Sequence, residues 1–479
     1  MSQPINHNIT FGSSASLSSP IGKLPVETLM EIFKVYAMSN PEVLDQRVVD
    51  LCLVAKHWNV VANCTPRLWT KINIFFPFGH RHLAVAQRRV CASKLEEIDV
   101  SIDFRDPEWD GCEPLYNDSD SGDTNESIWV KNIMVVLRGT EKRWRSIKVV
   151  SETWLPLYKL MKVWRFTHLP SLGSVSMERP NATFGMRDVL FNPQVLVGPM
   201  SLFGHHASMP NLTELSLSAV HVDWDEASVC FQNLRTLKII NQTYDVGPSF
   251  EQFAAMLSSS PHLEYLDVSG FCPEHHTGPL SLAGDAPDIP VVHLPALKEL
   301  TFGWKDIYLG STFLQMFQIG RSLESLTLLD TESGFGCWGD PQDGSRGWIR
   351  DSGEIFEDLY ELGPAASWDW DVLPPGPFIS VSKVRKLRIA WTKASWLVPL
   401  LETMEELEEI WLEDVDEEVF KAVVSIGRAR AREGRPLSLD LRWMWEKEVP
   451  RLAERPILEL EEAGTKVYAR GGGITEAWS

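Results

Sequence analysis

The chain has 479 residues, of which 44% are hydrophobic and 23% are charged, and its formal net charge is −20. This balance is typical of a globular protein with a sizeable core, and the length suffices for several domains or for one long repeat array. The acidic charge argues against nucleic acid or an anionic membrane surface as the partner, because both require clustered Lys and Arg side chains.

The seven cysteines are scattered along the chain, and none forms a CxxC pair. This pattern indicates reduced thiols in an intracellular protein, cytoplasmic or nuclear, rather than a disulfide scaffold. Residues 1–20 are polar and rich in serine, without the basic and apolar regions of a secretory signal, and we expect a disordered leader there. No apolar run in the sequence is long enough to span a bilayer.

The pattern changes at Ile21, where apolar residues begin to recur at helical spacing. Pro25 is suited to the start of the first helix. A second set recurs every three or four positions from Leu51, and Pro66 ends it. The result is two or three short helices that bury little core alone, and an apolar face left over in this way normally marks an interface.

The order and spacing of these residues resemble the F-box motif, and the matching segments are Leu24-Pro25-x-Glu27-x-Leu29-x-x-Ile32-Phe33, Leu51-x-x-Val54-x-x-x-Trp58 and Pro66-x-Leu68-Trp69. The resemblance covers residues 21–75 and implies docking on a Skp-family adaptor and, through it, on a cullin. The adaptor contacts that it implies are Leu24, Pro25, Ile32, Leu51, Val54 and Trp58, with Trp69 bracing the module. The alternative is an ordinary helical hairpin packed on the rest of the chain.

A short phrase, apolar-x-x-apolar-x-apolar, recurs through the remainder of the sequence. Its last two apolar residues are two positions apart, so they point to one side of a short strand. Amphipathic helical stretches, such as the one that starts at Phe250, lie between the copies. Clear copies begin at Leu212, Leu234, Leu263, Leu297, Leu323, Val384 and Leu407, and weaker ones at Leu95, Trp144 and Leu172.

Strand, turn and helix in repetition are typical of a leucine-rich-repeat solenoid, although spacings of 22 to 34 residues between the clear copies from Leu212 to Leu323 are irregular. We therefore predict an α/β fold with a short N-terminal helical F-box module followed by an irregular leucine-rich-repeat solenoid. The predicted boundaries are 21–75 for the module, 76–446 for the solenoid and 447–479 for a C-terminal tail. The alternative is a generic α/β domain whose buried strands carry the same phrase.

Two segments interrupt the repeats. Residues 106–127 are acidic and rich in turn formers, which predicts a mobile loop. Residues 331–383 form a long insertion with four tryptophans among acids and glycines, which is either a surface loop or a lid that contacts the substrate.

No sequence motif supports catalysis, metal binding or cofactor binding. The GxGxxG sequence from Gly334 to Gly339 is followed by Pro341 and further glycines, which suit a helix start poorly. Cys272 and the nearby His275-His276 lack the further ligands that zinc requires. We therefore expect a protein that is not an enzyme.

The resemblance implies the substrate-recognition subunit of an SCF-type ubiquitin ligase, whose repeats bind a target protein of unknown identity. Alternating side chains of stacked strands would form the target surface, because they point away from the core. The predicted substrate-binding residues on this face are Tyr265, Asp267, Lys386, Arg388 and Trp411. One alternative is a leucine-rich-repeat scaffold without a ligase role, and another is an enzyme with an unrecognised site. A need for phosphorylation of the target stays open.

Overall fold

The structure is a computed structural model that describes most of the chain. The described residues are 24–39, 44–109, 124–165, 167–180, 191–193, 196, 202–203, 209–270, 273, 290–304, 313–314, 316–330, 379–390, 394–413, 417–443, 451–462 and 464–471. The predicted leader and most of the predicted insertion, including its tryptophans and the GxGxxG sequence, lie outside them.

The chain begins with a small helical unit that has a core of its own. Its elements are α1 (Val26–Met38), α2 (Leu44–Val54), α3 (Lys56–Asn63) and the 3-10 helix η3 (Pro66–Trp69). Leu29, Phe33 and Ala37 line one face of α1 at helical spacing and are fully buried. They pack with apolar residues of α2, α3 and η3 into a cluster that is separate from the main core of the protein.

The rest of the described chain is built on a sheet of thirteen strands in which every neighbouring pair is parallel and the strands follow the order of the sequence. These strands are β1 (Lys71–Phe75), β2 (Ile98–Asp103), β3 (Trp144–Val150), β4 (Ser174–Glu178), β5 (Glu214–Ser218), β6 (Thr236–Ile240), β7 (Tyr265–Val268), β9 (Glu299–Trp304), β11 (Ser325–Asp330), β12 (Lys386–Ala390), β13 (Glu409–Glu413), β14 (Ser438–Trp443) and β15 (Lys466–Gly471). Two further short strands, β8 (Val292–His293) and β10 (Phe317–Gln318), pair with each other.

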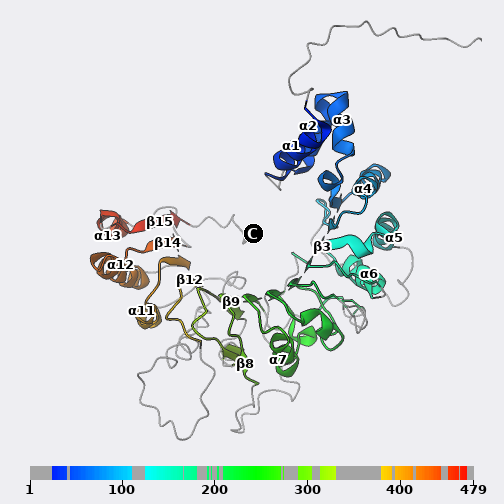
Figure 1. Ribbon diagram of the computed structural model, residues 1–479. Helices are drawn as coiled ribbons and strands as arrows, with labels where there is room; N and C mark the ends of the chain where they lie inside the picture. Colours follow the sequence, from blue (N-terminus) through cyan, green and yellow to red (C-terminus); the bar gives the residue numbers. More distant parts are fainter. Residues whose placement is uncertain are drawn as a thin grey trace, which may run out of the picture.

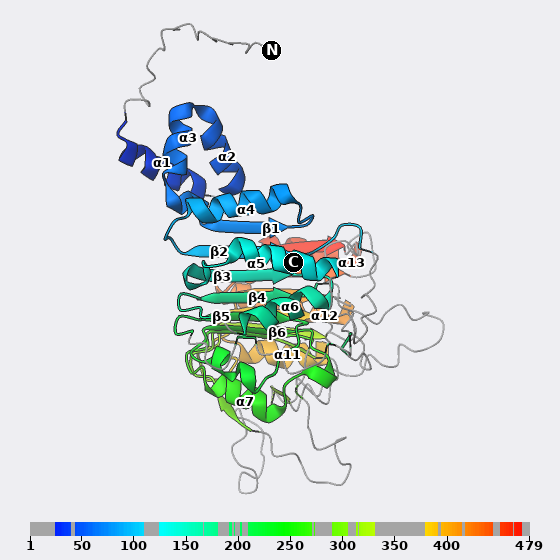
Figure 2. The ribbon, with the colours of Figure 1, turned by 90° about the vertical axis from the view of Figure 1, so that its right-hand side faces the viewer.

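The sheet curves into an arc, with the strands on its inner side and the helices on its outer side (Figure 1). Figure 2 shows the strands stacked one above another, with the three-helix unit beyond β1 at one end. The outer helices are α4 (His80–Ala92), α5 (Asn125–Leu137), α6 (Trp154–Trp164), α7 (Phe250–Ser258), α11 (Ala394–Thr403), α12 (Glu417–Arg432) and α13 (Arg451–Glu462).

Strand alternation produces two continuous rows of buried side chains. Leu237 is in register with Leu215 on one side and Leu266 on the other, and each is about 1% exposed or less. Two residues further along, Ile239 and its counterparts form the second row. The outer helices pack over these rows, and the buried side chains of successive repeats join in one continuous core. The observed class is mixed α/β, as predicted, and the strands form one large parallel sheet.

Several predicted boundaries differ from the structure. The sheet runs on into the segment predicted to be a tail, because β15 pairs with β14 along its whole length. Lys71–Phe75, predicted as the end of the helical module, is the first strand of the sheet. The predicted loop 106–127 overlaps α5, whose N-cap Thr124 accepts a hydrogen bond from the Ser127 backbone amide. Ile379, inside the predicted insertion, bridges Ile319.

Phe313 lies at the centre of an aromatic cluster and offers a test of the separate cores. Its ring centroid is 5.3 to 6.2 Å from those of Phe250, Phe253, Phe302 and Phe317. Phe313→Ala should cost about 3–5 kcal/mol of the local unfolding free energy, because it leaves a cavity.

Hydrogen exchange should therefore accelerate in β9 and β10 and stay unchanged in α1–α3, whose core is separate. Phe75, which is 50% exposed, provides the control, and Phe75→Ala should cost no more than about 1 kcal/mol. Equal acceleration in α1–α3 would show that the two cores unfold together.

Candidate functional site

The three-helix unit carries an unusual amount of exposed apolar surface. Nine of the eighteen exposed large apolar side chains among the described residues belong to residues 26–60. Val35 is 71% exposed on α1, Leu53 is 76% exposed on α2, and Val60 is 60% exposed on α3. The helices are apolar on two sides, one that closes their own core and one that faces solvent, and a concentration of this kind marks an interaction site.

Three of the predicted adaptor contacts lie at this surface. Pro25 is exposed at the N-cap of α1, where its ring suits the helix start. Ile32 is 41% exposed on α1, and Val54 is 60% exposed at the end of α2. These side chains are available to a partner, together with others that the sequence reading did not single out.

Three other predicted contacts belong to the core of the unit itself. Leu51 is only 4% exposed. Trp58 is partly buried, with its ring centroid 4.9 Å from that of Phe33, and Leu24 is a partly buried residue at the edge of the same cluster. The helical spacing placed these residues on apolar faces of the helices. It could not show which of the two apolar faces packs into the core of the unit.

Trp69 occupies the junction between the helical unit and the sheet. It is 7% exposed, and its indole Nε1 donates a 2.8 Å hydrogen bond to the Ala62 carbonyl oxygen. The guanidinium groups of Arg88 and Arg89 on α4 both lie 6.0 Å from the centroid of its ring. Arg89 also donates to the Lys71 carbonyl oxygen of β1. Trp69 therefore lies between the unit and the first repeat.

The inner face of the sheet holds the predicted substrate-binding residues. Tyr265 is half-buried on β7, with the Lys238 ammonium of β6 4.8 Å from its ring centroid. On β12, Lys386 is exposed and its Nζ lies 3.8 Å from a Glu409 carboxylate oxygen. Three strand spacings of about 4.8 Å separate β7 from β12, so the two groups are roughly 14 Å apart on one face.

Arg388 and Trp411 are brought together by the register of β12 and β13. The Arg388 guanidinium lies 3.9 Å from the Trp411 ring centroid, and its Nη2 is 3.3 Å from a Glu413 carboxylate oxygen. An arginine held between a ring and a carboxylate is oriented before any partner arrives.

Asp267 is in the predicted row but is not an exposed contact. It is only 8% exposed and accepts a 2.8 Å hydrogen bond from the Ser269 hydroxyl. Burial raises the pKa of its carboxyl above the ordinary value, although the nearby Lys238 and the Ser269 bonds act in the opposite direction. The alternation of the strand placed this side chain on the correct face but could not show how deeply its neighbours cover it.

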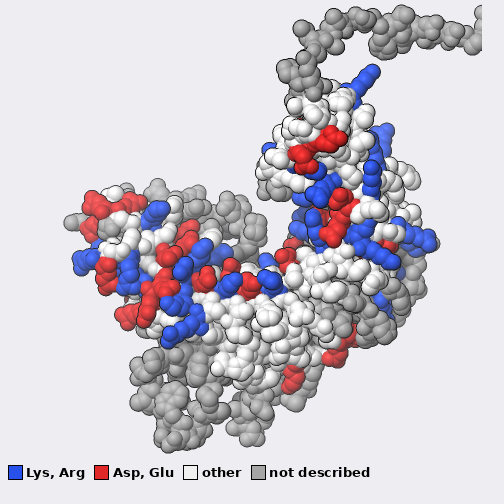
Figure 3. Space-filling view, in the orientation of Figure 1, with Lys and Arg blue, Asp and Glu red and all other residues white. Residues whose placement is uncertain are grey.

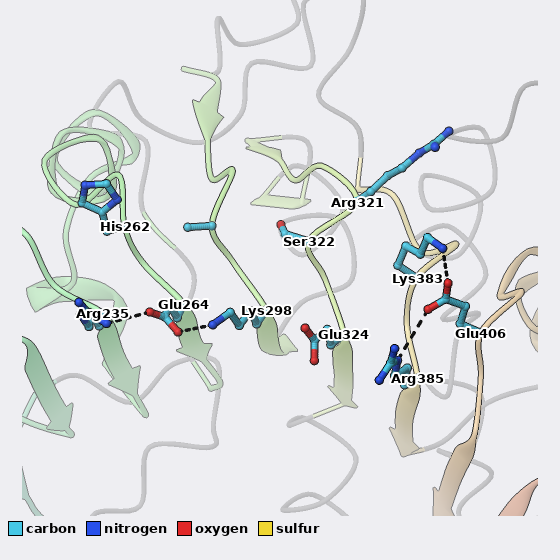
Figure 4. A pocket seen from close by; sticks show the side chains of 11 residues that line it. Arg235, His262, Glu264, Lys298, Arg321, Ser322, Glu324, Lys383, Arg385 and Glu406 are labelled. Carbon is cyan, nitrogen blue, oxygen red and sulfur yellow. Dashed lines mark hydrogen bonds and ion pairs between the residues drawn. The ribbon is translucent and has the colours of Figure 1, made fainter.

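The sequence reading missed a groove along the edge where the strands begin, shown in Figure 4. This groove has a volume of about 540 Å³ and is lined mainly by charged side chains. The signal was present in the sequence, because the residue directly before each strand alternates in sign across six repeats: Arg235, Glu264, Lys298, Glu324, Arg385 and Glu408.

Within the described part of the chain, no three His, Cys, Asp or Glu side chains gather in a way that could hold a metal ion. Among the same residues, no helix combines the length and the apolar character needed to cross a bilayer.

Asp267 yields a pH prediction. A carboxyl whose pKa is raised by folding favours the folded state below its unfolded pKa, near 3.8, and this contribution is lost as pH rises through the raised value. Asp267→Asn keeps an acceptor for Ser269 and removes the buried charge. Its melting temperature should exceed that of the parent at pH 7, and the difference should shrink near pH 4. A variant that melts lower at pH 7 would contradict this reading.

Comparison with known proteins adds no family to this description. The sequence matches no protein-family model. A search of the curated proteins finds no significant match either. The assignment of function therefore depends on the residues and on the geometry described above.

Proposed function

We propose that the protein is the substrate-recognition subunit of an SCF-type ubiquitin ligase, with an F-box module followed by leucine-rich repeats. The proposal combines two features: the sequence of residues 21–75 resembles the F-box motif, and the helices of that segment expose apolar side chains. The second is the observation that carries it. A free apolar face on a small helical unit suits a permanent partner, here a Skp-family adaptor that links the chain to a cullin.

We assign the adaptor contact to the exposed side chains of the unit rather than to its core. Pro25, Ile32 and Val54 remain from the residues that the resemblance implied, and Val35 and Leu53 join them on exposure. Leu24, Leu51 and Trp58 support the contact by holding the helices in place. Trp69 fixes the unit on the first repeat through the Arg88 and Arg89 guanidinium groups that lie over its ring.

The inner face of the sheet is the proposed target-binding surface. Tyr265, Lys386, Arg388 and Trp411 present aromatic rings and cations, the side chains that most often anchor protein interfaces. Asp267 contributes by supporting β7 from within, since it is buried.

The adaptor contact can be tested with two valines of equal exposure. Val35 is 71% exposed on α1, and Val135 is 70% exposed on α5. Val35→Asp should weaken adaptor binding at least about tenfold, because a carboxylate would be desolvated in an apolar interface. Val135→Asp introduces the same charge on an outer helix and should leave binding unchanged.

Calorimetry with a purified Skp-family adaptor measures both variants. Tight binding by the parent and by Val135→Asp, lost in Val35→Asp, supports the assignment. Failure of the parent chain to bind any Skp-family adaptor would leave only a repeat protein without a ligase role.

The target surface calls for a separate variant. Tyr265→Ala combined with Lys386→Ala removes two exposed or half-exposed side chains and should hardly change the melting temperature. Adaptor affinity should stay the same, and fewer proteins should become ubiquitinated when the ligase is reconstituted with this chain. An unchanged set of ubiquitinated proteins would exclude this part of the inner face.

A further inference from the structure

The groove at the strand edge carries a charge opposite to that of the whole chain. Its lining includes five Arg or Lys side chains and three glutamates, a formal charge of +2, whereas the chain has a formal net charge of −20. In Figure 3 charged side chains of both signs follow the inner rim of the arc, and much of the surface below them is white. A local excess of cations on an acidic protein calls for an explanation beyond solubility.

Two of the three glutamates are already occupied by cations. The Glu264 carboxylate lies 3.2 Å from Arg235 and 2.6 Å from Lys298, and it bridges the two (Figure 4). Glu406 pairs in the same way with Lys383 and, at 3.7 Å, with Arg385. Each trio keeps one net positive charge, and the hydrogen bonds from Lys298 and Lys383 lower the pKa of Glu264 and Glu406, respectively.

Between the trios lie two groups without such a partner. No carboxylate among the described residues pairs with Arg321, which is exposed at the rim. The neighbouring Ser322 hydroxyl is buried and has no hydrogen-bond partner within the described part of the chain. A buried hydroxyl without a partner costs free energy, so its position in the groove favours a ligand that supplies one.

The shape of the groove selects an extended ligand. Its lining comes from six successive repeats, those of β6, β7, β9, β11, β12 and β13. Five spacings of about 4.8 Å give a length of roughly 24 Å, which an extended peptide of about seven residues would fill. The third glutamate, Glu324, lies on the same floor and acts electrostatically on Lys298. It would repel a dense polyanion but tolerate one or two anionic groups.

We propose that this groove binds an extended segment of the target protein through an oxyanion side chain placed between Lys298 and Arg321, with Ser322 as an additional hydrogen-bond donor. The inference rests on the proposed function in treating the ligand as part of a target. A phosphoserine and a glutamate share the required chemistry, and the experiment separates them.

The test uses the full chain and three fluorescein-labelled Gly/Ser dodecapeptides. Their centres carry two phosphoserines, two glutamates or two serines, and fluorescence anisotropy reports binding at low salt. One or both anionic peptides should bind, the serine peptide should not, and about 1 M salt should abolish binding. The stronger anionic peptide identifies the preferred group.

Arg321 is the residue to replace, because no carboxylate among the described residues loses its partner with it. Arg321→Ala should weaken anionic-peptide binding about tenfold or more, and Arg321→Lys should weaken it less. Arg81→Ala, which removes an exposed arginine from α4, is the matched control and should have no effect.

The outcomes separate this inference from the proposed function. Adaptor binding without binding of either anionic peptide at about 1 mM overturns the groove assignment and leaves the receptor function intact. Arg321-dependent peptide binding in a chain that does not bind the adaptor would support the groove assignment and overturn the receptor function. Tighter binding of a single-stranded oligonucleotide than of the peptides would overturn the peptide assignment.

Discussion

The parallel register of the strands is the constraint on which the rest of the molecule depends. Each strand buries two side chains, such as Leu266 and Val268 on β7, against equivalents on its neighbours. Because the strands stay parallel from β1 to β15, with a register shift at Ile98/Asp99 between β2 and β3, side chains of one kind form rows along the arc. The core, the inner face and the charged edge are consequences of the same repeat, seen at successive positions along the strand.

A different physical constraint applies to the three-helix unit. Its helices close a core of their own around Phe33, and this core is separate from the main one. A core that small cannot cover both sides of each helix, and apolar residues such as Leu53 stay in water. The guanidinium groups of Arg88 and Arg89 on α4 lie over the Trp69 ring and hold this surface in place relative to the repeats.

The sequence pattern predicted those features of the fold that depend on residues close together in the chain. The two-residue alternation of Leu237 and Ile239 requires a strand with one buried side wherever it occurs, and the parallel sheet follows from its repetition. Burial is decided by neighbours far away in sequence, so neither the inward position of Leu51 nor the covered carboxyl of Asp267 could be predicted. The groove escaped notice for a related reason: Arg235 and Glu264 are 29 residues apart and become an ion pair only when their repeats stack.

The groove carries an excess of cations on a chain whose net charge is negative, and this difference in charge affects how an anion could be recognised. At physiological ionic strength charges are screened over about 8 Å, so distant acidic residues raise the cost of approach only weakly once a ligand reaches the groove. There, Lys298 and Arg321 act at short range, and Glu264 and Glu406 hold neighbouring cations in position rather than cancelling them. A long polyanion would extend beyond the groove onto the rest of a chain whose formal net charge is −20. Such a surface favours a short anionic stretch over nucleic acid, and the overall charge then sharpens selectivity instead of opposing it.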